Sequence, residues 1–450
     1  MKIYQLPDIP REWEIKQVRH IFEIHNGSTP KSGNPEFWNG DIDWITPDDL
    51  GSNAGKLITS SRRKITQLGY KSCGVSLAPS GSIALSTRAP IGHIAITKMA
   101  ACVNQGCRIL VPKEGLTEYW YYSFISSRAL LISLGQGTTF MELPRQNLAS
   151  VALPVPPFDE QKAIVRFLDY KTAQIDALIA RKQSLLDKLA EQRTALISQA
   201  VTKGLDPSVS MKDSGVEWIG EVPAHWLLGV KLNYLSAAGK NTFVNGPFGS
   251  DLLTSELTDE GVPVVYSGDI KPGSFINKSS KFVTEQKAEQ LRFCRVDPGD
   301  LLLAKVGDPP GDAAIYPESL PSGIVTQDVV RIKLDNNSAD AEYLSFLLNS
   351  LYGRFVIKQV SVESTRGRFS LGDFKSLRFV LPPVEEQIAI SNSLRERIRP
   401  LLLQEKKVVD VITLLQEYRA ALITNAVTGK VDVRDFCIPT TTEQREVAHG

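Results

Sequence analysis

The hexapeptide Pro156-Pro157-Phe158-Asp159-Glu160-Gln161 decides the architecture of this 450-residue chain, because its pattern occurs twice. It returns 226 residues later as Pro382-Pro383-Val384-Glu385-Glu386-Gln387. With the same shift and no gap, segment 191–206 falls on segment 417–432 with nine identical residues. Matches at both ends of a gapless window of about fifty residues indicate an internal duplication.

Each copy of the repeat predicts one long helix. Two prolines precede it, Asp159 can cap its first turn, and Gly204 follows its end. Apolar residues then recur at seven-residue spacing, with an interruption at Lys182, which is typical of a coiled coil. The residues expected to pair the helices are Leu168, Ile175, Leu189 and Leu196 in the first copy and Leu394, Leu401, Val408, Leu415 and Leu422 in the second. We expect the two copies to pair with each other as an antiparallel coiled coil, with a kink or interruption at Pro400.

The segments between the repeats resemble each other more loosely. The stretch "IPREW" (9–13) parallels "VPAHW" (222–226), and "WITPDDL" parallels "VYSGDI", which matches Asp48 with Asp269. In both segments a strand pattern also follows a glutamine, in "NQGCRILV" and "TQDVVRIKL". Short strand patterns punctuated by Gly and Pro and mixed with short helices indicate an α+β domain.

The sequence therefore predicts an α+β fold in which two tandem α+β domains are separated by two long helices, as a pseudo-twofold duplication. The expected boundaries are 1–155 for the first domain, 156–208 for the central helix, 209–381 for the second domain, 382–436 for the distal helix and 437–450 for a flexible C-terminal tail.

Composition excludes several classes of protein. With 42% hydrophobic and 22% charged residues the chain is globular, and no segment approaches the roughly 18 apolar residues of a membrane span. The N-terminus is too charged for a signal peptide, so we expect a cytoplasmic protein.

The net charge of +1 argues mildly against DNA as the sole partner. The five cysteines form no C-x-x-C pair and the five histidines show no ligand spacing, so we expect no metal site.

Two stretches suggest catalysis, but both are incomplete. Asp308-Pro309-Pro310-Gly311 is similar to the D-P-P-aromatic motif of adenine methyltransferases, yet Gly311 replaces the aromatic residue that would stack on the flipped base. Pro7, Asp8, Glu14 and Lys16 follow the order of a nuclease site, but they lie too close together to span two strands of a metal-binding core. We therefore expect a non-catalytic chain.

The order of these features resembles the DNA-specificity subunit of type I restriction-modification enzymes. The resemblance rests on the two hexapeptides, on "ALISQAVTKGLD" (195–206), on "MKDSGVEWIGEVPAHW" (211–226) and on "NGPFGSDL" (245–252), and it covers nearly the whole chain. It implies two target-recognition domains, each reading one half of a bipartite double-stranded DNA sequence. It also implies paired helices that dock two methyltransferase (modification) subunits, with motor-nuclease (restriction) subunits completing the complex. S-adenosylmethionine, ATP and magnesium would then belong to the partner subunits, and none would be bound by this chain.

Candidate DNA contacts are arginine, lysine and threonine residues of the two domains, because Arg can read guanine edges whereas Lys mostly holds phosphates. In the first domain they are Thr29, Lys31, Arg62, Arg63, Lys64, Arg88, Thr138, Thr139 and Arg145. In the second domain they are Lys271, Lys278, Lys281, Lys305, Arg366 and Arg368. Loops 135–145 and 361–368 are the stronger candidates, since they occupy equivalent places in the two domains.

Two other interpretations stay open at this point. The chain could be a coiled-coil scaffold whose domains bind protein and not DNA. It could also be the specificity subunit of a related fused restriction-methylation system. The recognised bases do not follow from one sequence, because each base contact depends on loop geometry.

Overall fold

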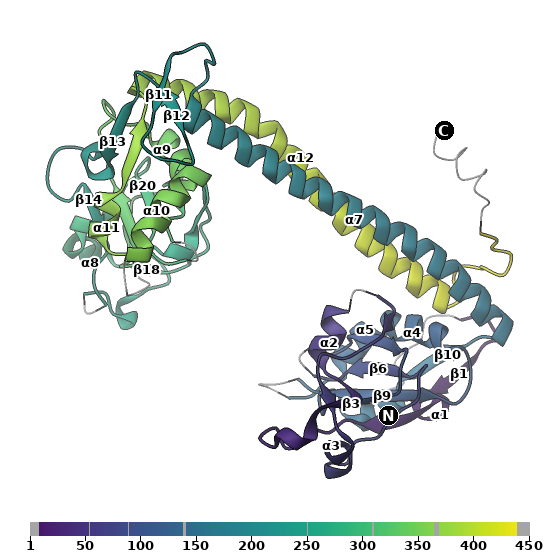
Figure 1. Cartoon of the computed structure of the whole chain (residues 1–450). Helices are drawn as coiled ribbons and strands as arrows, with labels where there is room; N and C mark the ends of the chain where they lie inside the picture. Colours follow the sequence, from purple (N-terminus) through teal and green to yellow (C-terminus); the bar gives the residue numbers. More distant parts are fainter. Residues whose placement is uncertain are drawn as a thin grey trace. The chain divides into compact units, whose positions relative to one another are not determined.

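The structure, a computed structural model, describes residues 9–53, 55–88, 90–137, 141–249, 251–307, 310–363 and 369–438. The chain divides into two compact units, the first formed by Met1–Gln183 with Asp410–Gly450 and the second by Ser184–Val409. Each unit holds one α+β domain together with part of both long helices, α7 (Phe158–Lys203) and α12 (Val384–Val427) (Figure 1).

The domain of the first unit is built on two sheets. The larger has the strand order β2-β9-β6-β7-β4 and the smaller the order β5-β3-β8. Their bounds are β2 Phe22–Asn26, β9 Cys107–Pro112, β6 Ile83–Ser86, β7 Ile94–Thr97, β4 Leu57–Ile58, β5 Lys64–Ile65, β3 Trp38–Ile45 and β8 Ala101–Val103. A separate antiparallel pair joins β1 (Glu14–Gln17) to β10 (Ala152–Val155). The helices are α1 Val18–Ile21, α2 Pro47–Ser52, α3 Gln67–Ser72, α4 Thr117–Ser126, α5 Arg128–Ser133 and α6 Arg145–Ser150, with a 3-10 turn η1 at Pro35–Phe37.

The domain of the second unit repeats this plan. Its sheets have the orders β14-β23-β20-β21 and β18-β15-β22-β19, and β13 (Leu227–Lys231) pairs with β24 (Arg378–Leu381) as β1 pairs with β10. Bounds are β14 Phe243–Asn245, β23 Val329–Ile332, β20 Leu301–Ala304, β21 Ala313–Ile315, β18 Phe282–Val283, β15 Val262–Val265, β22 Gly323–Val325 and β19 Arg295–Val296. β3 pairs in parallel with β8 in the three-stranded sheet of the first domain, and β15 pairs in parallel with β22 in the second of the two sheets of the second domain. The shared strand order confirms the predicted duplication of an α+β domain.

The remaining elements of the second unit are short apart from α9 and α10. They are β11 Met211–Asp213, β12 Glu221–Pro223, β16 Ile270–Lys271, β17 Ser274–Phe275, α8 Glu285–Gln290, α9 Ala341–Asn349, α10 Leu351–Glu363, α11 Leu371–Ser376 and the 3-10 turns η2 Leu232–Leu235, η3 Thr254–Glu256, η4 Ser267–Asp269 and η5 Arg292–Cys294.

The repeated hexapeptide fastens each helix start to its domain. Glu160 accepts a hydrogen bond of 3.1 Å from the indole N–H of Trp13, and Glu386 accepts one of 3.1 Å from Trp226. The Gln161 amide then accepts from the backbone N–H of Leu116 at 2.8 Å. Gln387 likewise accepts from the backbone N–H of Asp340 at 3.0 Å. The Glu-Gln pair is therefore the joint between helix and domain in both units.

The end of the other long helix also packs at each joint: the end of α12 in the first unit and the end of α7 in the second. Gly204 follows α7 with φ +74°, and Gly429 follows α12 with φ +72°, a conformation that favours glycine just after a helix end. A Cβ atom at Gly204 would lie 3.4 Å from the Trp226 ring, and one at Gly429 would lie 2.4 Å from Pro10. Each domain is thus held by the start of one long helix and the end of the other.

The long helices run antiparallel within each unit. In the first unit Asp176 of α7 pairs with Arg419 of α12 at 2.8 Å, and Leu168, Ile175 and Leu422 lie in one core cluster (Figure 1). In the second unit Arg193 pairs with Glu405 at 3.1 Å. Of the predicted pairing residues, Leu168, Ile175, Leu189, Leu394, Leu401, Val408 and Leu422 are buried, whereas Leu196 and Leu415 are partly exposed.

Pro400 does not interrupt the second helix, which contradicts the predicted interruption, while the alternative of a kink stays a prediction. The proline lies inside α12, which continues to Val427. Proline removes one backbone hydrogen bond from a helix interior and clashes with the preceding turn. The neighbouring Ile398 and Leu401 are buried, and this tertiary packing offsets the local cost of the proline.

None of the described helices combines the length and the apolar character needed to cross a membrane.

Candidate nucleic-acid interface

Several loops meet at one end of the first domain because of the strand register. Asn26 at the end of β2 lies opposite Arg108, and Ser86 at the end of β6 lies opposite Cys107 at the start of β9. In the smaller sheet, the end of β3 lies beside the end of β8, with Ile45 opposite Val103. The loops that follow or precede these residues therefore share one edge of the domain.

The same edge exists in the second domain. Asn245 lies opposite Val330, and Ala304 lies opposite Val329. In the sheet that contains β15 and β22, Val265 lies beside Val325. Both domains thus present one set of loops, which we call the loop edge: in the first domain residues 26–34, 46–49, 61–64, 87–88 and 104–106, and in the second residues 245–249, 266–269, 278–281, 305 and 326–328.

An Asn-Gly pair packs the first loop of each edge tightly against a second loop. The backbone N–H of Ser28 donates to the Val103 carbonyl at 3.1 Å, and that of Gly246 donates to the Thr326 carbonyl at 3.2 Å. A Cβ atom at Gly27 would lie 1.7 Å from the Asn104 carbonyl oxygen, and one at Gly246 would lie 2.0 Å from the Val325 carbonyl oxygen. Only glycine permits this approach in the two domains.

A buried aspartate fixes two further loops at each edge. One carboxylate oxygen of Asp49 accepts from the backbone N–H of Thr46 at 2.8 Å, and the other accepts from that of Arg62 at 3.0 Å. Asp269 makes the corresponding bonds to the N–H groups of Tyr266 at 2.8 Å and Lys278 at 3.1 Å. Each aspartate therefore ties a helical turn to the basic loop beside it.

This geometry corrects the match of Asp48 with Asp269. Asp48 is exposed, and its neighbour Asp49 is the buried residue equivalent to Asp269. The sequence places two aspartates side by side, and a loose alignment without burial data does not distinguish them.

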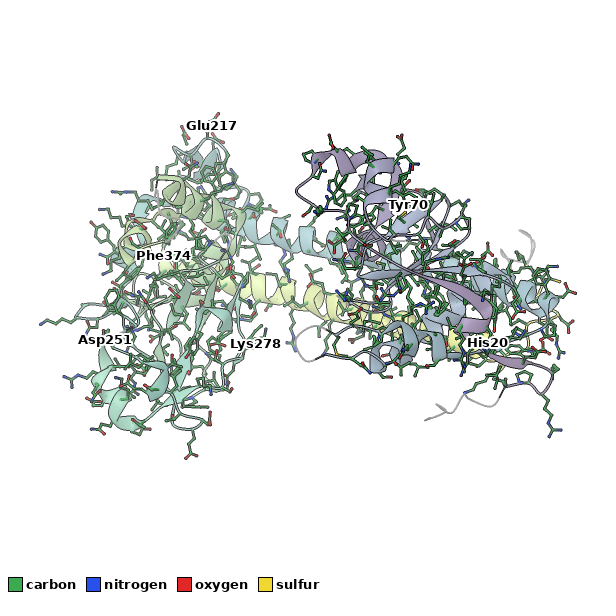
Figure 2. All side chains as sticks on the ribbon, turned by 90° about the horizontal axis from the view of Figure 1, so that it is seen from below. His20, Tyr70, Glu217, Asp251, Lys278 and Phe374 are labelled. Atoms are coloured by element: carbon green, nitrogen blue, oxygen red, sulfur yellow. The ribbon has the colours of Figure 1, made fainter. Side chains whose placement is uncertain are left out.

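The structure brings five first-domain candidates together at the loop edge. Thr29 donates to the side-chain oxygen of Gln105, and Lys31 is exposed in the same loop. In the neighbouring loop, the Arg62 side chain approaches Asp49 at 4.0 Å and Lys64 pairs with Asp43 at 3.4 Å. Between them the Arg63 guanidinium stacks on Trp38, 3.7 Å from the ring centroid. Tyr70, labelled in Figure 2, packs against the same aromatic cluster.

Arg88 and Arg145 are already engaged within the domain. Arg88 pairs with Glu142, which also accepts from Arg108 at 3.5 Å. Arg145 begins α6 and donates to the Ile24 carbonyl at 3.3 Å. Hydrogen bonds between Gln136 and Glu142 close the stem of loop 135–145, while Thr138 and Thr139 lie outside the described residues.

In the second domain the lysines surround the Asp269 loop. Lys271 and Lys278 are exposed, and Figure 2 shows Lys278 on the surface of the second unit. Lys281 pairs with Asp259 at 3.0 Å, and Lys305 donates to the Gln327 carbonyl at 3.2 Å. Arg366 and Arg368 lie outside the described residues.

Two residues at the loop edge, Gln105 and Gln327, were not among the contacts predicted from the sequence. Gln105 lies between β8 and β9, and Gln327 lies between β22 and β23, so each connects the two sheets of its domain. Gln105 is exposed and Gln327 half-buried. Their signal was present in the parallel stretches "NQG" and "TQD", although neither residue is basic.

The described residues contain no group of three or more His, Cys, Asp or Glu that could hold a metal ion. Burial raises the pKa of the Cys102 and Cys294 thiols to about 12, so both stay protonated and unreactive at neutral pH. Asp308 and Pro309 of the D-P-P-G stretch lie outside the described residues.

Comparison with known proteins identifies the family. A family model described as "Type I restriction modification DNA specificity domain" matches residues 10–187 and 249–411, more than half of the chain. The MjaIX type I restriction enzyme specificity subunit of Methanocaldococcus jannaschii is 39% identical over 188 residues, which cover 40% of this chain and 43% of that protein. The EcoR124I/EcoR124II specificity subunit of Escherichia coli is 32% identical over 166 residues, covering 35% of this chain and 40% of that protein.

Longer matches are weaker in sequence but extend over nearly the whole chain. The M. jannaschii MjaVIII specificity subunit is 20% identical over 440 residues, covering 95% of both chains. A solved structure from work on complex assembly and conformational transition of the type I R-M system covers 95% of this chain and 100% of its own, with a TM-score of 0.69 and 14% identity. That likeness supports the fold. The chain with its two α+β domains and two long helices belongs to the type I restriction-modification DNA specificity family.

Proposed function

We propose that this chain reads a bipartite double-stranded DNA site, one half with each domain, as the non-catalytic specificity subunit of a type I restriction-modification enzyme. In that complex its long helices hold two methyltransferase subunits, and motor-nuclease subunits join them. S-adenosylmethionine, ATP and magnesium serve the partner subunits.

The observation that carries this proposal is that the same loop edge is built twice. Gly27 and Gly246, and likewise Asp49 and Asp269, hold their loops through equivalent contacts. The side chains on these two loop edges nevertheless differ. The first domain has Arg62-Arg63-Lys64, and the second has Lys278 and Lys281. Loops with the same backbone structure and different side chains are suited to reading two different half-sites. Contacts with bases select the DNA sequence, whereas contacts with the DNA backbone position the protein.

Exposed apolar side chains on the long helices support partner docking. In the first unit Leu414 is 65% and Tyr418 55% exposed, and in the second Leu402 and Leu403 are also exposed. Apolar residues that gather on a helix surface mark protein interfaces, since water contact with them is unfavourable. We therefore place one methyltransferase subunit on the helix pair of each unit.

The test is selection of bound DNA from a randomised library by the chain assembled with its methyltransferase. We expect two short enriched motifs separated by a fixed number of unread base pairs, and a mass corresponding to two methyltransferase subunits per chain. A complex that enriches no sequence would support the protein scaffold instead. A methyltransferase fused to this polypeptide in its source, with the same DNA selection, would favour the related fused system.

A further inference from the structure

The Arg63 side chain is held on an aromatic platform. Its guanidinium carbon lies 3.7 Å from the centroid of the Trp38 ring and 5.5 Å from that of Trp44. The two indoles meet edge to face at 5.1 Å and both are buried. A guanidinium stacked by its face on an indole keeps its N–H edge available for hydrogen bonds.

The platform itself is fixed to the loop edge. The Trp44 indole N–H donates to the Ser28 carbonyl at 2.9 Å, and that of Trp38 donates to the Lys31 carbonyl at 3.4 Å. Both rings belong to a core cluster with Ile65. Movement of either indole would therefore disturb loop 26–34 as well as Arg63.

The backbone of Arg63 is fixed at the other end of the side chain. Its carbonyl accepts from the Ser61 hydroxyl at 2.6 Å and from the Trp44 backbone N–H at 3.3 Å. Ser61 is in turn bound through its own N–H to Asp43 at 2.8 Å. With both ends held, the long side chain loses little conformational entropy when its edge binds a ligand.

The charges around Arg63 distinguish it from its neighbours. Arg62 lies 4.0 Å from the Asp49 carboxylate and Lys64 lies 3.4 Å from that of Asp43. In the described part of the chain Arg63 forms no ion pair, although its side chain is exposed. Of three consecutive basic residues, the middle one therefore presents a full set of N–H donors to solvent.

We propose that Arg63 reads a guanine in the half-site bound by the first domain, donating two hydrogen bonds to the O6 and N7 atoms of the base, with Trp38 as its positioning residue. This inference rests on the proposed function. A bidentate guanidinium matches the guanine edge in the major groove, whereas a lysine ammonium lacks the planar fork. Val264 occupies the position of Trp44 in the second domain, since Val265 and Ile45 lie at equivalent places beside Val325 and Val103. The second domain therefore has no indole at the position of Trp44.

The experiment compares variants of the assembled complex on DNA duplexes in which each base pair of both half-sites is changed in turn. For Arg63→Ala we expect a loss of about 5- to 150-fold in discrimination at one guanine of the first half, with the second half unchanged. Arg63→Lys keeps the charge and is expected to lose most of the same discrimination. Trp38→Phe keeps an aromatic face and is expected to retain it within a few-fold, whereas Trp38→Ala is expected to reduce it.

Arg62→Ala is the matched control, because it removes the same charge from the adjacent position. We expect it to weaken binding to all sequences about equally. If Arg63→Ala behaves in this way too, Arg63 holds a phosphate and the inference is wrong, while the proposed function stands. If the unchanged complex discriminates no base in either half, the proposed function itself fails.

Discussion

Replacing Trp226 with alanine is expected to lower the free energy of unfolding of the second unit by about 3–5 kcal/mol. The side chain is fully buried, packs in the core of that unit and donates its indole N–H to Glu386 at 3.1 Å. The substitution leaves a cavity at the joint where α12 begins and α7 ends. Chemical denaturation of the full chain, followed by a fluorescent label in the second domain, measures the change.

Trp226→Phe separates packing from hydrogen bonding at the same joint. It keeps an aromatic ring in the core and loses the bond to the Glu386 carboxylate, for which we expect about 1.5–3 kcal/mol. The first unit should unfold as before in both variants. A loss below about 1 kcal/mol for Trp226→Ala would mean that the joint contributes little to holding the second domain.

Lengthening both long helices by one heptad is expected to move the preferred DNA site to a longer spacer. Seven residues inserted after Asp187 in α7 and after Thr413 in α12 preserve the seven-residue apolar spacing. Each helix gains about 10 Å, which corresponds to roughly three base pairs of B-DNA at about 3.4 Å each. Rotation about the DNA axis restricts which spacings bind.

Binding to oligonucleotides with graded spacers measures this effect. Both half-sequences should remain those of the parent chain, and affinity for the original spacer should fall. Insertion into α7 alone is the control, because it shifts one helix against the other and is expected to destabilise the pair. An unchanged spacer preference in a folded, active double insertion would show that the helices do not set the spacing.

The helices and the duplication were predictable because their signals are local and periodic. The hexapeptide marks both helix starts, and the Glu and Gln within it have defined partners in each unit. The predicted interruption at Pro400 was wrong for the opposite reason. Helix propensity is a local quantity, whereas the burial of Ile398 and Leu401 depends on tertiary packing.

The structure brings together some of the candidate contacts, such as Thr29 and residues 62–64, but the preferred loop 135–145 is not part of the loop edge, and DNA contact by any of these residues stays a prediction. Charge alone could not separate Arg63, which is stacked and without an ion pair in the described part of the chain, from Arg88, which pairs with Glu142. It also passed over Gln105 and Gln327, which carry no charge. The residues that could pair with a basic side chain lie far from it in the sequence. One sequence does not reveal which of them are its neighbours in the fold.

The central claim, that each domain reads its own half-site, is tested most directly by Gln105→Ala and Gln327→Ala in the assembled complex. These residues occupy equivalent places at the two loop edges, and neither is buried in a core. Base preference is measured at every position of both half-sites. We predict that Gln105→Ala relaxes preference in one half, Gln327→Ala relaxes it in the other, and each loss is about 1–3 kcal/mol at the position concerned. A change in both halves from either substitution, or in neither half from both, would contradict the account.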